Sequence, residues 1–246
     1  MEKVILTPRK MVLPVATTLS SEFLEAYQEG IKSYDAKARK TLDIFSDRNG
    51  DFAGSNCFAP LELRKYLPKE TMLATMADLG RATEINPGFL NGFYSDTGLV
   101  LRTAGDHYNP NDLLAKVLAE QLKEKGMPLQ EGIPKIIYFD ALNLKRDSNS
   151  AYGLIYFLND NAEKGKNIID TPELSEENYS FKTMDERGVP IKDNLGKRTC
   201  YTRKDGVSRF CLYWYSNAYS NFRNLADSYD DGRVVGVTSE AGSQKI

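Results

Sequence analysis

Residues 208–233 read SRFCLYWYSNAYSNFRNLADSYDDGR, and the interpretation of the whole chain starts from this stretch. It holds seven aromatic residues, four Ser, three Asn and three Asp, but no Lys, Glu, Gln or Met. Those four types make up 45 of the 246 residues, so roughly five would be expected in a stretch of this length. Large rigid aromatics beside Ser and Asn are typical of antibody paratopes. Because buried phenols and amides each need a partner, the composition favours a recognition surface over a core.

The four absent residue types all have codons that end in a purine. Every residue of the stretch except Trp214 can be encoded by a codon that ends in a pyrimidine. Randomising the two adenines of an AAY asparagine codon produces this set of residues. The alternative is that a short segment rich in Tyr and Ser lacks the four types by chance, and composition alone leaves both interpretations open.

The longer run SRFCLYWYSNAYSNFRNLADSYDDGRVVGV, residues 208–237, resembles the variable region of proteins diversified by retroelements, especially the archaeal variable proteins. NGFYSDTGLVLRTAGD (91–106), NDLLAKVLAEQLKEKG (111–126) and GKRTCYTRKDG (196–206) are similar to the same group. In that group an error-prone reverse transcriptase rewrites adenines, and a C-type lectin-like domain displays the result. The closing GRVVGV resembles the last strand of the related formylglycine-generating-enzyme-like folds.

This resemblance implies an α+β, C-type lectin-like fold with short antiparallel strands, two or more helices and much irregular structure. It also divides the segment into a frame and varied positions. The implied frame is Ser208, Arg209, Leu212, Leu225, Ala226, Ser228, Gly232, Arg233 and Val234. The expected ligand-binding positions are Cys211, Tyr213, Trp214, Tyr215, Asn217, Tyr219, Asn221, Phe222, Arg223, Asn224, Asp227, Tyr229 and Asp230. Their side chains should face solvent together on an unchanging backbone, although core burial is an alternative for Trp214.

The chain as a whole suits one large domain over residues 1–246. A formal charge of -2 gives no electrostatic footprint for nucleic acid or an anionic membrane. No apolar run is long enough for a membrane span, and residues 1–21 lack the apolar core of a secretion signal. We therefore expect a monomer that stays in the cytoplasm or reaches a surface by another route, with a macromolecular partner, most simply a protein.

Neither a disulfide framework nor a metal centre is expected from the reactive residues. Three cysteines at long spacing, Cys57, Cys200 and Cys211, suggest reduced thiols. A single histidine, His107, cannot build a zinc cluster and lacks an evident partner for acid–base catalysis. We therefore expect no cofactor.

The N-terminal residues 20–85 are predicted to be mainly helical, after a β-prone lead-in over 3–18 that two prolines interrupt. Ser20 or Ser21 should cap a helix through residue 40, and residues 60–85 read as helical. The buried face of the first helix should hold Phe23, Tyr27, Ile31 and Tyr34.

Residues 43–60 allow two interpretations. The spacing from Asp47 begins like a calcium-binding loop, but Phe52 stands where that loop needs Gly and Phe58 where it needs Glu. The turn dipeptide Asn49-Gly50 accounts for the same region, so we expect a hairpin.

Farther along, residues 98–102 should form a strand and 112–125 a helix, capped by Asn109 or Asn111. The buried face of that helix should hold Leu114, Val117, Leu118 and Leu122. Residues 135–144 and 151–160 are predicted as neighbouring antiparallel strands, followed by a mostly irregular stretch over 161–200.

Three other functions compete with ligand display. A formylglycine-generating-enzyme-like oxidoreductase would need a cysteine pair, and the three cysteines form no such motif. A calcium-dependent carbohydrate-binding lectin would carry a Glu-Pro-Asn or Gln-Pro-Asp signature, which is absent. The tyrosines could instead close an oligomer interface. The sequence favours a binding protein that is not an enzyme.

Overall fold

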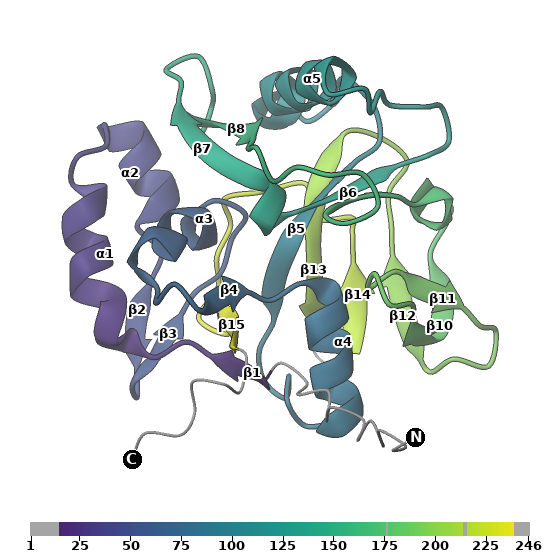
Figure 1. Ribbon diagram of the computed structural model, residues 1–246, viewed down its shortest axis with the longest axis horizontal. Helices are drawn as coiled ribbons and strands as arrows, with labels where there is room; N and C mark the ends of the chain where they lie inside the picture. Colours follow the sequence, from purple (N-terminus) through teal and green to yellow (C-terminus); the bar gives the residue numbers. More distant parts are fainter. Residues whose placement is uncertain (1–14, 176, 214–215, 239–246) are drawn as a thin grey trace, which may run out of the picture.

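A long mixed β-sheet runs through the middle of the computed structural model, with helices on both of its faces (Figure 1). The structure describes residues 15–175, 177–213 and 216–238. Within these ranges the large sheet has eight strands in the order β11-β10-β12-β14-β13-β5-β6-β9. All neighbours are antiparallel except β12 (Arg198–Tyr201) and β14 (Asn217–Tyr219), which run parallel. The fold is therefore of the mixed α+β class.

Side chains of the two central strands, β5 (Ser95–Leu101) and β13 (Val207–Tyr213), alternate between two hydrophobic cores. Val100 and Phe210 pack in one core with α4 (Met76–Ile85). Leu99 and Val207 pack in the other with α5 (Asn109–Glu124). The two strands are thus packed on both faces, so the first residues of the 208–233 segment, which belong to β13, are held rigidly.

Strands from distant parts of the chain meet in a second, three-stranded sheet. β15 (Val235–Thr238) lies between β1 (Val15–Thr18) and β4 (Thr71–Leu73), and both pairs are antiparallel. The C-terminal strand is thereby held in the interior of a sheet.

The predicted hairpin over residues 43–60 is confirmed. β2 (Ser46–Arg48) and β3 (Asp51–Ala53) pair antiparallel around Asn49 and Gly50. Both turn residues have positive φ, 59° and 92°, as the two-residue turns that match strand twist require.

The helix predicted over residues 21–40 is in fact two helices. α1 covers Leu24–Ile31 and α2 covers Ala36–Leu42. The break is at Asp35, whose carboxylate accepts hydrogen bonds from the amides of residues 37 and 38 and so begins a new helix. Tyr27 and Ile31 are buried, as the helical spacing predicted.

The prediction of continuous helix over 60–85 is wrong in its middle. α3 (Ala59–Leu63) and α4 are separated by strand β4, which pairs with the distant β15. Thr75 and Asp78 form a reciprocal capping box that begins α4. The strand depends on a partner about 160 residues away, so no local pattern reveals it.

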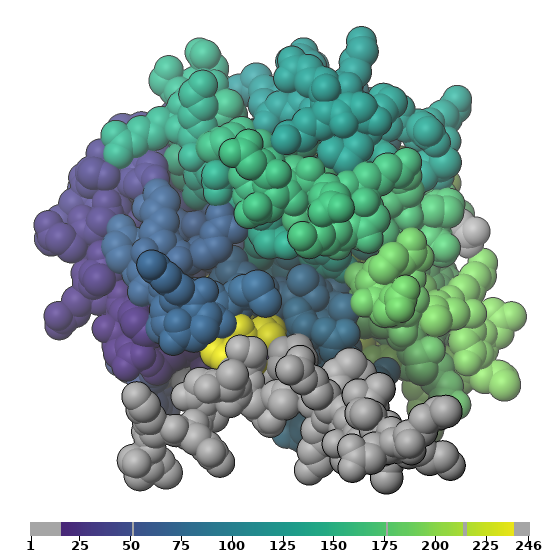
Figure 2. Space-filling model, in the orientation of Figure 1, coloured from purple at the N-terminus to yellow at the C-terminus, as the bar shows by residue number. Residues whose placement is uncertain are grey.

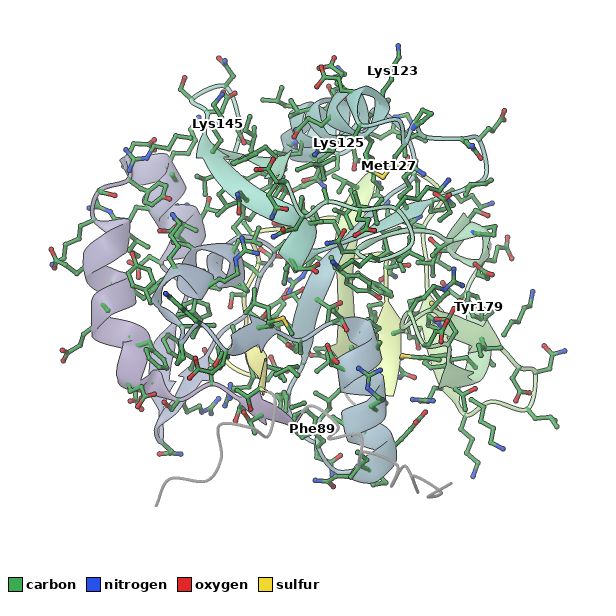
Figure 3. All side chains as sticks on the ribbon, in the orientation of Figure 1. Phe89, Lys123, Lys125, Met127, Lys145 and Tyr179 are labelled. Atoms are coloured by element: carbon green, nitrogen blue, oxygen red, sulfur yellow. The ribbon has the colours of Figure 1, made fainter. Side chains whose placement is uncertain are left out.

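The helix expected at 112–125 is present as α5, but neither predicted asparagine caps it. Tyr108 occupies the N-cap, and Asn111 lies inside the helix with its side chain fully buried. Leu114, Leu118 and Leu122 are buried as expected, and Val117 is partly buried. Lys123 and Lys125, at the end of the helix, point away from the core (Figure 3).

The expected antiparallel pair is formed by β7 (Leu142–Arg146) and β8 (Leu154–Leu158). The first half of the strand predicted over residues 135–144 is instead β6 (Lys135–Tyr138), which belongs to the large sheet. The irregular stretch predicted at 161–200 is wrong, because it contains four strands: β9 (Ile168–Asp170), β10 (Tyr179–Met184), β11 (Pro190–Lys192) and β12 (Arg198–Tyr201).

Cys57, Cys200 and Cys211 are all free thiols, and all three are buried. In the ranges that the structure describes, no helix has both the length and the apolar character needed to cross a membrane. Of the β-prone lead-in over residues 3–18, Val15–Thr18 form β1; the earlier residues lie outside the described ranges.

Candidate functional site

A pocket of about 750 Å³ lies where the 208–233 segment folds over one face of the large sheet. This volume is within the range of ligand-binding pockets. Eight of the predicted binding residues line it: Cys211, Tyr213, Asn221, Phe222, Arg223, Asn224, Asp227 and Tyr229. Four further lining residues, Tyr94, Thr202, Arg203 and Arg209, were not predicted to bind ligand.

Alternation along β13 explains how the pocket floor forms. Arg209, Cys211 and Tyr213 share one face of the strand, opposite the buried Phe210. Across the β13·β14 pair, Cys211 lies opposite Tyr219. Cys211 is completely buried, and burial raises the pKa of its thiol. The expectation that it faces solvent is therefore wrong.

Stacked aromatic rings form one wall beside the pocket. Tyr219 lies between Tyr201 and Phe222, with ring centroids 4.5 Å and 4.9 Å away and nearly parallel planes. Tyr213 packs edge-on against Tyr219, with ring centroids 5.5 Å apart, and in a tilted arrangement against Tyr94 at 5.3 Å. Tyr201 comes from β12, whose parallel pairing with β14 places it beside Tyr219. Such contacts restrict ring rotation and hold the wall in shape.

The backbone of the segment is fixed by buried side chains from elsewhere in the chain. Arg102 donates to the carbonyl oxygen of Ser220 at 2.9 Å. Asn111 donates to that of Arg223 at 2.6 Å. These two bonds use carbonyl oxygens of the segment, so they do not depend on the side chain at that position. Arg102 also donates to the hydroxyl oxygens of Ser208 and Ser220.

The following turns are fixed in the same way by residues 54–57. The amide of Cys57 donates to the carbonyl oxygen of Leu225, and the side chain of Asn56 donates to that of Ala226. The amide of Gly54 donates to the carbonyl oxygen of Gly232. At Gly232 the backbones approach so closely that an added Cβ would lie 2.5 Å from the Ser55 amide nitrogen. Only glycine fits there.

Arg209 and Asp96 form a buried ion pair under the segment. Nε and Nη2 of Arg209 donate to the two carboxylate oxygens at 2.8 Å and 2.6 Å. Nη1 donates to the carbonyl oxygen of Asp227 at 2.8 Å. Burial alone would lower the pKa of Arg209, but Asp96 raises it well above the ordinary value, so the guanidinium stays charged. The guanidinium also lies 5.2 Å from the ring centroid of Tyr94.

Several predicted positions are exposed around the pocket. Phe222 and Tyr229 expose 41% and 60% of their surface, and Arg223 and Asp230 are also exposed. A second hollow of about 320 Å³ lies next to the pocket and shares Asp227 and Tyr229 with it. In the view of Figure 2 the end of the described chain is visible as a small yellow area.

The other predicted positions have different environments. Asn217 is half-buried, and its side chain accepts a hydrogen bond from the amide of Thr199. Asn224 donates to the Asp227 carboxylate at 2.7 Å. Asp230 lines the second hollow but not the first. Trp214 and Tyr215 lie outside the described residues, so their predicted roles stay predictions.

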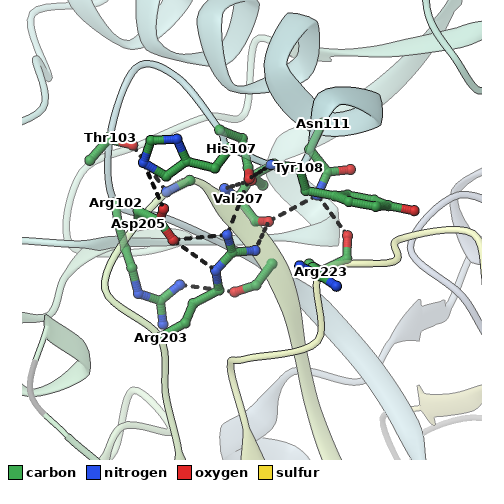
Figure 4. A network of polar contacts seen from close by, with 12 residues as sticks. Arg102, Thr103, His107, Tyr108, Asn111, Arg203, Asp205, Val207 and Arg223 are labelled. Atoms are coloured by element: carbon green, nitrogen blue, oxygen red, sulfur yellow. Dashed lines mark hydrogen bonds and ion pairs between the residues drawn. The ribbon is translucent and has the colours of Figure 1, made fainter.

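A polar network supports the side of the pocket near α5 (Figure 4). Arg203 pairs with Asp106 at 3.1 Å and with Asp205 at 2.8 Å, while Arg223 lies over the ring of Tyr108 at 5.2 Å. His107 is 93% exposed in its side chain and lies 3.4 Å from Asp205. The structure therefore places His107 on the rim of this network, away from any enclosed site.

Sequence reasoning missed Tyr94, Tyr201 and Arg203 as parts of the site. The available signal was the resemblance, whose 91–106 run contains Tyr94 and whose 196–206 run contains Tyr201 and Arg203. Among the residues that the structure describes, no group of three or more His, Cys, Asp or Glu is arranged to hold a metal ion. Compared with family models, with curated proteins and with solved structures, the chain gave no match.

Proposed function

We propose that this chain is a ligand-binding display protein with a C-type lectin-like fold. Its 208–233 segment is diversified by a retroelement and recognises varied macromolecular targets, either proteins or cell surfaces. The supporting observation is that buried side chains fix the backbone of the segment while some of its own side chains face solvent. Backbone carbonyls are held by Arg102, Asn111 and Arg209, whereas Phe222 and Tyr229 project from the same loop into solvent.

The burial pattern supports the same proposal. Six of the nine implied frame residues are buried: Ser208, Arg209, Leu212, Leu225, Gly232 and Val234. Side chains that the fold does not use can change without a large effect on stability. A backbone fixed before binding also reduces the entropy lost on association.

The competing functions gain no support from the site. All three thiols are buried, and burial raises the pKa of each, which is the opposite of what a reactive cysteine needs. This argues against an oxidoreductase that resembles the formylglycine-generating enzyme. A calcium-dependent lectin would need a cluster of oxygen ligands, and the described residues contain no group of three or more His, Cys, Asp or Glu placed to hold a metal ion.

Two matched libraries test the proposal. In one, AAY-derived codons replace Tyr213, Asn221, Phe222, Arg223 and Tyr229; in the other, the same codons replace Ser208, Arg209, Leu212, Leu225 and Gly232. We expect most members of the first library to resist proteolysis, and some to bind immobilised lysozyme at micromolar concentration. Most members of the second should be degraded. Equal protease resistance in the two libraries, or no binder in the first, would refute the proposal.

The proposed origin has its own test at the nucleotide level. The gene should lie near a reverse transcriptase gene and a second copy of the 208–233 coding region. That copy should differ from the first only at adenines. Differences spread over all four bases would contradict a retroelement origin.

A further inference from the structure

One buried hydrogen-bond acceptor in the pocket has no partner. The Oδ1 atom of Asn221 is inaccessible to solvent and makes no hydrogen bond with any described residue. Unpaired buried polar atoms are rare in native proteins because each costs free energy. Because Asn221 itself lines the pocket, a turn of its side-chain amide would present this acceptor to a donor on a ligand.

A second acceptor lies in the same pocket. One oxygen of the Asp227 carboxylate accepts from Asn224, and the other has no hydrogen bond among the described residues. Asp227 also lines the neighbouring hollow with Asp43 and Asp230, and no Lys or Arg is among the residues that line that hollow. The junction of the two hollows therefore favours a positively charged donor.

The three arginines that line the pocket do not repel a positively charged ligand equally. The charge of Arg209 is neutralised by Asp96, and that of Arg203 by Asp106 and Asp205. Of these three, only Arg223 has no carboxylate partner in the described ranges. Its guanidinium lies to one side, over the ring of Tyr108. The remaining walls are aromatic, with Tyr94, Tyr213, Phe222 and Tyr229 among the lining residues.

We propose, on the basis of the proposed function, that the partner of this chain is a protein that inserts an arginine side chain into the pocket. A guanidinium is planar, carries five donors and no acceptor, and stacks on aromatic faces. It can pair with the second carboxylate oxygen of Asp227, and with Asn221 Oδ1 once that amide turns toward the pocket, while its plane stacks on one of the lining tyrosine rings. Arginine is also one of the residues most enriched at the energetic centres of protein interfaces.

The test is an NMR titration of the full chain with N-acetyl-arginine amide. We expect saturable shifts of tyrosine ring signals with a Kd on the order of millimolar, as for any ligand of this size. The isosteric neutral analogue, N-acetyl-citrulline amide, should bind at least fivefold more weakly. Asp227→Asn and Asn221→Leu should each weaken arginine binding at least fivefold. Asp160→Asn, at an exposed carboxylate outside both hollows, should leave it unchanged.

Three results would overturn the inference. N-acetyl-glutamate amide could bind more tightly, with the binding lost in Arg223→Gln, which would make the partner's anchor acidic. Maltose could bind more tightly than the arginine probe, which would favour a glycan surface. The arginine probe could also produce no shift. If members of the first library still bind lysozyme in any of these cases, only the arginine anchor fails and the display function stands.

Discussion

The buried Arg209–Asp96 pair should be the main energetic support of the segment, and its removal provides a quantitative test. Arg209→Met leaves the Asp96 carboxylate in the core with only Ser55 as a side-chain partner, because Ser55 Oγ donates to it at 2.7 Å. Removing one partner of a buried ion pair costs about 3–5 kcal/mol. At about 2–4 °C for each kcal/mol in a chain of this size, the melting temperature should fall by roughly 10 °C.

The matched control is Arg223→Met, which makes the same chemical change elsewhere in the 208–233 segment. Arg223 is exposed, and its hydrogen bond to Asn111 uses only its carbonyl oxygen. We expect a change within about 0.5 kcal/mol. The assay is guanidinium denaturation followed by fluorescence and circular dichroism. The double variant Arg209→Met with Asp96→Leu should recover much of the loss, because no charge is then left buried.

Two outcomes would refute this reasoning. Arg209→Met could lower the free energy of unfolding by less than about 1 kcal/mol, which would mean that the Arg209–Asp96 pair does not stabilise the segment. Alternatively, Arg223→Met could cost as much as Arg209→Met. The division between supporting and projecting residues would then be wrong, whatever the ligand proves to be.

Three further predictions concern tyrosines, thiols and a glycine. Burial raises the pKa of both Tyr94 and Tyr213 from 10.0 to about 12. The stability that these two protonated tyrosines contribute is complete below pH 10 and is lost as the pH rises through 12. Absorbance at 295 nm should therefore show tyrosines that ionise late, together with alkaline unfolding, and their ionisation at pH 10 in the folded protein would contradict the structure. The three buried cysteines should not react with a disulfide reagent in the native protein and should all react in guanidinium, and rapid native labelling would refute their burial. Gly232→Ala should destabilise the chain by about 1–3 kcal/mol, because the added Cβ would collide with the Ser55 backbone. The control is Gly132→Ala, which should cost about 1 kcal/mol, because φ is +70° there but no atom lies within 4 Å of the added Cβ. Equal losses in thermal melts would show that crowding at Gly232 is unimportant.

Features that depend on neighbouring residues could be predicted from the sequence. The Asn49-Gly50 hairpin follows from turn chemistry, and α5 follows from its apolar spacing. Strand β4 could not be found, because it is short and its partner β15 is distant in sequence.

Asn111 shows why the site was only partly predictable. Its position before an apolar helix suggested a cap, yet its amide instead donates to the carbonyl oxygens of Val207 and Arg223. The second of these bonds joins residues 112 positions apart. Composition could identify which segment carries exposed aromatics, but not which buried groups support it, since that depends on tertiary packing alone.

The loop from Ser220 to Gly232 is attached at successive carbonyls along its length, and it is anchored before by β13 and after by β15. Adding or deleting a single residue would shift every later carbonyl away from its donor, so the number of residues is constrained far more strictly than their identity. Any process that alters this loop must therefore work by replacement at constant length, and a one-codon insertion should be more damaging than several simultaneous exchanges.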